Sequence, residues 1–437
     1  MKKIFYIFFA FAIGVLISGC ARRSNGKVSK EIWKGEPSQL LTKDEVKQET
    51  EIKIARVKNF LKENNLAGIL LTQVRNFYWM TAGTADNQIV LNKDVGAASL
   101  LIMNDGRKYL ICSESEAGLL MDEALSDLGY QLKEFPWYEA NSVKDVRGKI
   151  IREIAGTGRV GSDINYPGTE LVADKFAKLR YQLTNTEIKR YKWLGEQTTE
   201  AVSDVCRKLM PGMNEYEIEA MTSASLRSRG IMPTVLLIAV NDRIYKYRHA
   251  LPVGDTLKDY AMVNVVAEKW GMPIAVTRFV HFGKLPKNLE ENIKKAAVVN
   301  AHYEEATKPG TSIEKIFEEC QQWYASVGFN DEWKNHHQGG AIGYNDREYI
   351  LYPGNSETVL DHQAFAWNPT VPGSKVEETL VAYKDSTEVI TKSKNWPMIN
   401  VELYGKIYPQ PAILLKDPQT GKIIDQPVVT INARDYK

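Results

Sequence analysis

The sequence has little cysteine, little histidine and no long run of charge of one sign. Its four cysteines include no C-x-x-C pair, which argues against a structural zinc site. If Cys20 belongs to an export signal, three cysteines remain, and an odd number argues against a disulfide framework. The net charge of +2 gives no indication of nucleic-acid binding, and no glycine-rich phosphate loop supports a nucleotide-binding role.

The remaining composition is that of an ordinary globular protein. Hydrophobic residues make up 44% of the chain and charged residues 25%. A chain of 437 residues can bury a sizeable core, and we expect it to form two domains.

The first twenty residues predict export. Two lysines precede an apolar run over residues 4–17, and two small residues then precede Cys20. This order is typical of a secretory signal, and Cys20 resembles the lipidated cysteine of a bacterial lipobox. A plain membrane anchor is the alternative, but the run is short for a span of about 20 residues. We therefore expect residues 1–20 to be a lipoprotein signal peptide and residues 21–50 a polar tether. The protein would then be anchored to a membrane, facing the periplasm or the cell surface.

Apolar spacing predicts an α+β fold. Helices are expected over residues 51–65, 114–128, 172–183, 186–208, 214–230, 289–306 and 312–327. Strands are expected at residues 68–71, 98–103, 107–112, 233–240, 261–268, 274–281, 364–368 and 375–383. Turn signals join 98–103 to 107–112 and 261–268 to 274–281 as hairpins. We expect an α/β domain over residues 51–184, a second domain over 185–395, and an extension over 396–437 with a hairpin at 412–424.

The stretch over residues 335–348 is the segment around which the chain is organised. It holds two of the six histidines, His336 and His337, beside a Gly-Gly pair, and it ends in Arg347 and Glu348. Histidine is the side chain that titrates nearest to neutral pH, so the pair indicates a site. The alternatives are a loop with two exposed imidazoles and a surface Arg-Glu ion pair worth about 0–1 kcal/mol. The histidines at 281, 302 and 362 fall in a strand, a helix and a loop, and we interpret them as structural.

Several short motifs occur in the order in which they occur in one protein family. They are Asn-Phe-Tyr-Trp-Met-Thr-Ala-Gly at 76–83, Tyr-Arg-His ending at His249, Val-Thr-Arg ending at Arg278, Thr-Lys-Pro-Gly ending at Gly310, and Val-Glu-Glu around Glu377. This ordered set, over about residues 50–395, resembles the pita-bread family of methionine aminopeptidase, aminopeptidase P, prolidase and creatinase. The resemblance implies a pita-bread domain preceded by a creatinase-type α/β domain, in a homodimer.

The metallopeptidases of this family hold two metal ions with five ligands. The resemblance places those ligands on Asn264, Ala275, Gly340, Asn368 and Glu377, and only Glu377 keeps a metal-binding side chain. A divalent cation needs anionic oxygens or imidazole around it. We therefore expect no metal at these positions, and no other cofactor.

Creatinase, which works without a metal and uses a histidine as its acid/base group, implies roles for the remaining polar residues. Those with an implied catalytic role are His249, His336 and Glu377. Those with an implied role in substrate binding are Arg347, His337, Glu348 and Arg278. Creatine itself is not the expected substrate, because Ala275 stands where creatinase keeps a glutamate.

Three hypotheses for the function stay open. The first is a metal-independent hydrolase or lyase that acts on a small amide- or guanidine-like compound or a short peptide. The second is a catalytically inactive pita-bread domain that binds a peptide, a small ligand or a protein partner. The third is an Xaa-Pro metallopeptidase whose ligands lie elsewhere in the sequence.

Overall fold

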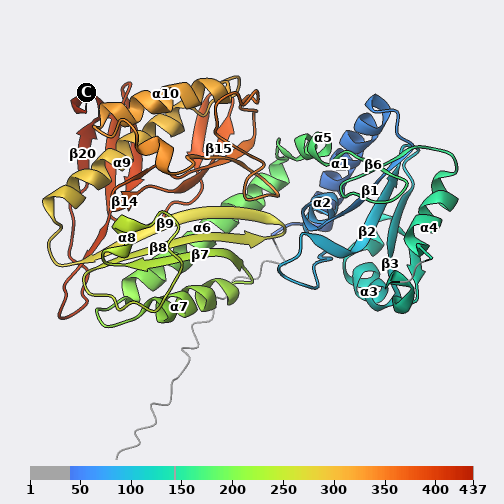
Figure 1. Cartoon of the computed structure of the whole chain (residues 1–437), viewed down its shortest axis with the longest axis horizontal. Coiled ribbons are helices and arrows are strands. Elements are labelled where there is room, and N and C mark those ends of the chain that lie inside the picture. The colour runs from blue at the N-terminus through green and yellow to red at the C-terminus, as the bar shows by residue number, and fades with distance from the viewer. Residues whose placement is uncertain (1–39, 142–143, 437) are drawn as a thin grey trace, which may run out of the picture. The chain divides into compact units, whose positions relative to one another are not determined.

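The computed structural model describes residues 40–141 and 144–436 (Figure 1). These residues lie in one compact unit. Cys20 and most of the predicted tether lie outside the described residues, so lipidation and anchoring stay predictions. Within the part that is described, no helix is both long enough and apolar enough to cross a membrane.

The first helix begins earlier than its apolar spacing predicts. Helix α1 covers Lys43–Glu63, whereas the prediction began at residue 51. The reason is a capping box, in which the Thr42 side chain accepts from the Glu45 backbone amide and the Glu45 carboxylate accepts from the Thr42 amide at 2.8 Å. The end of the predicted tether is therefore helical.

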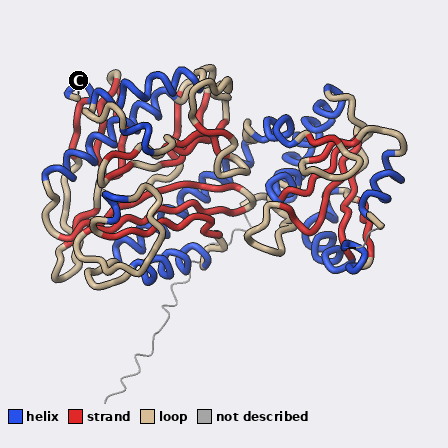
Figure 2. Tube along the Cα trace, in the orientation of Figure 1, coloured by secondary structure: helices blue, strands red, loops and turns tan. Residues whose placement is uncertain are grey.

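The N-terminal domain is a mixed six-stranded sheet flanked by helices (Figures 1 and 2). The strand order is β4 (Gln131–Phe135), β3 (Lys108–Ser113), β2 (Val95–Met103), β1 (Gly68–Gln73), β5 (Val160–Ser162) and β6 (Glu170–Leu171). The predicted β2–β3 hairpin is confirmed. The remaining helices are α2 (Val74–Met80), α3 (Glu114–Leu119), α4 (Val146–Ala155) and α5 (Ala173–Ala177). The helices predicted over 114–128 and 172–183 are shorter than expected, because α3 continues as π and 3₁₀ turns and α5 as a 3₁₀ turn.

Two sheets and four long helices form most of the second domain. One sheet has the order β19 (Leu414–Lys416), β9 (Met272–Phe282), β8 (Tyr260–Lys269) and β7 (Met232–Val240), and it is antiparallel except that β19 runs parallel to β9. The other has the order β11 (Tyr349–Ile350), β10 (Gly339–Ile342), β12 (Gln363–Trp367), β15 (Glu378–Tyr383) and β16 (Ser386–Val389). A short hairpin, β13 (Thr370–Val371) and β14 (Ser374–Lys375), lies between β12 and β15 in the sequence. Helices α6 (Asn185–Lys208) and α7 (Glu215–Arg227) pack on β7–β9, whereas α9 (Lys287–Ala306) packs on the β13–β14 hairpin and against α10 (Ile313–Ser326).

The predicted hairpin at 412–424 is present as one antiparallel bridge, Lys416–Ile423, with the Ile424 amide donating to the Leu415 carbonyl oxygen at 2.9 Å. The extension also holds strand β20 (Val429–Asn432), which pairs with β17 (Met398–Leu403). A longer hairpin, which the sequence did not predict, joins β17 to β18 (Lys406–Pro411). Its turn residues, Tyr404 and Gly405, both have positive φ (50° and 78°), as a type I′ turn requires. Strand β19 instead joins the edge of β9, so part of the extension completes a sheet of the second domain.

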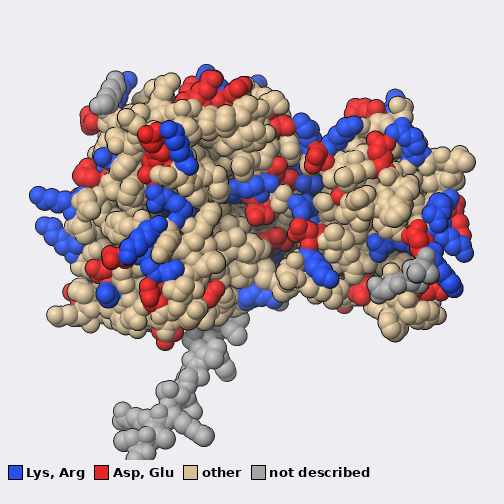
Figure 3. Space-filling model, in the orientation of Figure 1, with Lys and Arg blue, Asp and Glu red and all other residues tan. Residues whose placement is uncertain are grey.

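Charged side chains of both signs are interspersed over the face shown in Figure 3. This distribution agrees with the absence of a one-sign run in the sequence.

Candidate functional site

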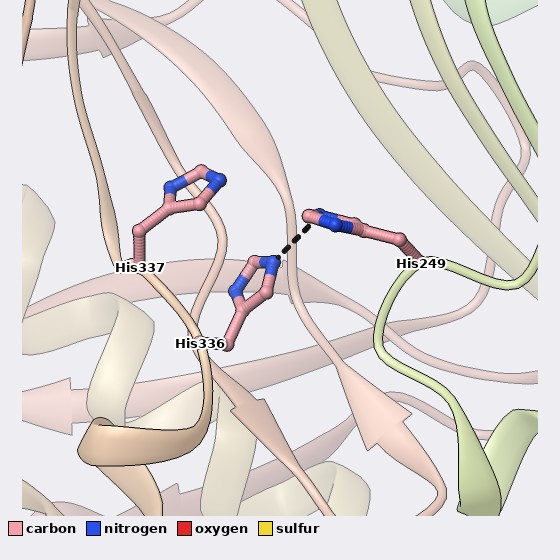
Figure 4. Close-up of side chains that lie close together, drawn as sticks. All are labelled: His249, His336 and His337. Atoms are coloured by element: carbon pink, nitrogen blue, oxygen red, sulfur yellow. Dashed lines mark hydrogen bonds between the residues drawn. The ribbon is translucent and has the colours of Figure 1, made fainter.

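Three histidines from two distant segments of the sequence meet in one cluster (Figure 4). His249 follows the short helix α8 (Arg243–Lys246), and His336 and His337 lie between a 3₁₀ turn and β10. The Nε2 atoms of His249 and His336 are 2.9 Å apart, which is a hydrogen-bond distance. The rings of His336 and His337 stack with centroids 4.4 Å apart. We refer to these three residues as the histidine cluster.

The loops that carry the histidine cluster are held together by an ion pair. Arg248, next to His249, pairs with Glu332, which lies in the 3₁₀ turn before His336. Because each partner is adjacent or nearly adjacent to a cluster histidine, the ion pair helps to fix the distance between the two loops.

The imidazoles of the cluster are held neutral at neutral pH. Burial, reinforced by the positive charge of Lys375, lowers the pKa of His336 to about 2. Burial and the charge of Arg347 lower the pKa of His337 to about 4. The pKa of His249 is also lowered, by burial first and then by Lys375. His249 and His336 are both neutral, and their Nε2 atoms are 2.9 Å apart. One of the two Nε2 atoms must therefore carry a hydrogen and donate it to the lone pair of the other Nε2.

Glu377 is buried near the cluster, but its hydrogen bonds go elsewhere. Its Oε2 accepts from Thr277 Oγ1 at 2.5 Å and from the Asn264 amide, and it lies 3.2 Å from Lys375 Nζ. Burial opposes ionisation of Glu377, yet Lys375, Thr277 and Arg347 outweigh it and hold its pKa below the usual range. The carboxylate is therefore charged and firmly held, and its influence on His249 is electrostatic.

Arg347 presents an unused donor to the same region. Its Nη1 donates to the carbonyl oxygen of Asp346 at 2.6 Å, while its buried Nε has no hydrogen-bond partner among the described residues. The guanidinium interacts electrostatically with both Glu377 and His337. An unpaired buried donor of this kind is suited to hold an acceptor on a ligand.

Glu348 and Arg278, which were both predicted to bind substrate, form buried ion pairs within the protein. Glu348 forms a buried ion pair with Arg180 at 2.6 Å, and not with Arg347. Arg278 pairs with Glu378 at 2.7 Å and donates to the carbonyl oxygen of Thr391 at 2.8 Å. The reason for Arg278 is strand alternation: Thr277 points toward Glu377, so the next side chain along β9 points to the other face. Both side chains are committed to the protein's own structure.

The five family metal-ligand positions do not supply a donor set for two divalent ions. The Asn264 amide nitrogen donates to Thr277 and Glu377, and Ala275 contributes only a methyl group in the core. A Cβ at Gly340 would lie 2.2 Å from the carbonyl oxygen of Tyr349, so no side chain fits on this backbone. Asn368 is buried and its Oδ1 has no partner among the described residues. The single carboxylate, Glu377, already has an ammonium beside it.

The histidine cluster is a separate candidate for one transition-metal ion. One ligand atom from each histidine lies within 4.8 Å of the others, and three imidazoles are a known donor set for zinc. However, nitrogens bound to one tetrahedral zinc lie roughly 3.3 Å apart, given Zn–N bonds of about 2.0–2.1 Å. The 2.9 Å separation fits a hydrogen bond better, and Lys375 and Arg347 repel a cation.

Sequence reasoning missed Lys375, the charge closest to Glu377. A usable signal was present, because residues at i and i+2 of an extended segment share a face. Lys375 and Glu377 have this spacing, so a lysine directed at the retained glutamate was predictable once Glu377 was singled out.

The fold confirms the predicted α+β class: the second domain is a pita-bread domain, and a creatinase-type α/β domain precedes it. Residues 189–390 match the model of metallopeptidase family M24. No curated protein sequence matches the chain.

Solved structures with the same fold include peptidases from three organisms. The prolidase from Pyrococcus horikoshii OT3 has 17% identity and a TM-score of 0.66, covering 78% of this chain and 99% of its own. The Xaa-Pro dipeptidase from Bacillus anthracis has 21% identity and a TM-score of 0.65, covering 79% and 98%. Aminopeptidase P from E. coli has 14% identity and a TM-score of 0.63, covering 79% and 94%. At these identities the likeness shows the fold.

Proposed function

We propose that this protein is a metal-independent hydrolase that cleaves a small amide- or guanidine-like compound or a short peptide. The observation that carries the proposal is the neutral, hydrogen-bonded pair of His249 and His336. A positioned neutral imidazole is a general base, and proton transfer of this kind contributes about 10²–10⁴ to a rate. The donor set at the family's metal positions supports the same proposal, because it lacks the anionic oxygens that two divalent ions need.

In the proposed reaction, His249 removes a proton from a water molecule as its oxygen adds to the carbon of the C–N bond. The protonated imidazole then delivers that proton to the leaving nitrogen as the C–N bond breaks. His336 holds the ring of His249 through the Nε2–Nε2 hydrogen bond. The free Nε–H of Arg347 binds an acceptor group of the substrate.

The test is a screen of amides, Xaa-Pro peptides and guanidino acids, followed by kinetics of His249→Ala. We expect kcat to fall by about 10²–10⁴ with little change in KM, because the imidazole acts on the transition state. His362→Asn is the matched control, since His362 lies in a loop outside the histidine cluster and asparagine tolerates its positive φ of 58°. Turnover by His249→Ala at the wild-type rate would refute the acid/base assignment.

A second candidate is a binding domain without catalysis. It is favoured by the loss of four of the five family metal-ligand side chains, which a decayed enzyme would also show. Such a protein would bind a peptide, a small ligand or a protein partner. Ligand binding that is unaffected by His249→Ala, together with no turnover in the screen, would favour this candidate.

We also propose, from the family resemblance, that the protein acts as a homodimer. From the N-terminal sequence we propose a lipid anchor at Cys20 on an exported protein.

A further inference from the structure

Lys375 is an uncommon neighbour for a retained metal-ligand carboxylate. It ends β14, and its Nζ lies 3.2 Å from Glu377 Oε2. The two side chains are only 5% and 3% exposed, so water screens the pair very little. The β13–β14 hairpin positions the lysine, because Lys375 pairs with Thr370 and the hairpin packs against α9.

Fixed charges of both signs surround the histidine cluster. Lys375 and Arg347 each lower the pKa of cluster histidines, so both the ammonium and the guanidinium act on this region. Glu377 opposes them at the cluster, and Asp346 also interacts with Arg347. Lys375 is the cation in direct contact with Glu377.

We infer that Lys375 is a built-in cation that takes the place of a bound metal beside Glu377. Its ammonium neutralises Glu377 and keeps divalent ions away from it. The inference goes beyond the proposed function, because it assigns Lys375 a role that does not depend on catalysis.

The effect of Lys375 can be distinguished from a simple loss of metal-ligand side chains. If only the missing carboxylates prevented metal binding, restoring one of them would restore part of the affinity. Asn264 already contacts Glu377, so Asn264→Asp creates a second carboxylate at the same point. While Lys375 is present, however, its ammonium still lies beside Glu377 and neutralises the negative charge that would attract a metal ion.

The first experiment measures Mn²⁺ binding to the full chain by electron paramagnetic resonance. Manganese is chosen because it prefers carboxylate oxygens, whereas three imidazoles favour zinc or copper. We expect no stoichiometric binding by the wild type or by Asn264→Asp, and binding at least about tenfold tighter by Asn264→Asp/Lys375→Ala. Equal binding by Asn264→Asp and the double variant, or no gain in a folded double variant, would overturn the inference.

The second experiment uses a more conservative substitution, so the test does not depend on the alanine variant folding. Mn²⁺ is titrated into Asn264→Asp/Lys375→Gln and into the matched control Asn264→Asp/Lys375→Arg, which keeps the positive charge. We expect tighter Mn²⁺ binding by the glutamine variant than by the arginine variant. Equal binding by the two folded variants would overturn the inference.

Neither experiment uses turnover, so their outcomes are distinct from those that test catalysis. A wild-type enzyme that needs a metal for activity refutes the proposed function directly. Mn²⁺ binding by the variants reports on the charge at Lys375 and not on catalysis.

Discussion

Replacing Glu348 with glutamine distinguishes a structural ion pair from a substrate-binding carboxylate. In the structure Glu348 Oε2 lies 2.6 Å from Arg180 Nη2, and its Oε1 accepts from Arg180 Nε at 3.1 Å and from the Tyr344 amide at 3.0 Å. The side chains are 3% and 1% exposed. Glu348→Gln keeps the size of the side chain but leaves the guanidinium of Arg180 buried without its counter-charge.

The expected cost follows from that burial. Removing the charge of one partner of a buried ion pair lowers the free energy of unfolding by about 3–5 kcal/mol. This is a large share of the roughly 5–15 kcal/mol that a folded domain has in total. Urea unfolding at pH 7 measures it as a lower midpoint with an unchanged slope.

The control is the exposed pair between Lys334 and Asp331, at 2.7 Å with side chains 56% and 76% exposed. Asp331→Asn should change stability by no more than about 1 kcal/mol, because water screens this pair. Arg180→Met/Glu348→Leu should recover most of the stability, since it removes both buried charges. A Glu348→Gln variant as stable as Asp331→Asn would refute the structural assignment of Glu348.

Three further predictions concern the site and the N-terminus. Burial and Lys375 lower the pKa of His249 from its usual value of 6.5. If His249 is the general base, kcat/KM should therefore fall only when the pH drops through a value below 6.5. An acid limb at or above 6.5 in a plot of kcat/KM against pH would contradict this. Arg347→Ala should raise KM more than it lowers kcat, because the guanidinium binds the ground state as well as the transition state; steady-state kinetics with an unchanged KM would count against it. Cys20→Ala should leave an unlipidated precursor, so normal lipid labelling and membrane partition of that variant would argue against the lipobox.

The parts of the fold that depend on local sequence were predictable. Asn214 and Glu217 form the capping box that the sequence indicates at the start of α7. The hairpins β2–β3 and β8–β9 were also predictable, because two apolar runs flank a short turn in each case.

The contacts of the site depend on tertiary structure, and sequence spacing does not reveal them. His249 and His336 are joined through loops that are fixed by the Arg248–Glu332 pair, and nothing in the local sequence pairs those two charges. The resemblance to the family placed the right histidines near one another, but it also placed Glu348 and Arg278 at the site. Their ion-pair partners, Arg180 and Glu378, come from distant segments, so the sequence does not reveal these pairs.

The most direct test of the central claim is the metal dependence of turnover by the purified full-length protein. Once a substrate is found, metal content is measured by elemental analysis, and activity is measured before and after exhaustive chelation. We expect no stoichiometric manganese, cobalt, zinc or iron, and an unchanged rate after chelation. About two metal ions per chain with activity abolished by the chelator would show a metallopeptidase, and one ion per chain with the same loss would place it at the histidine cluster; either result would contradict metal-independent catalysis.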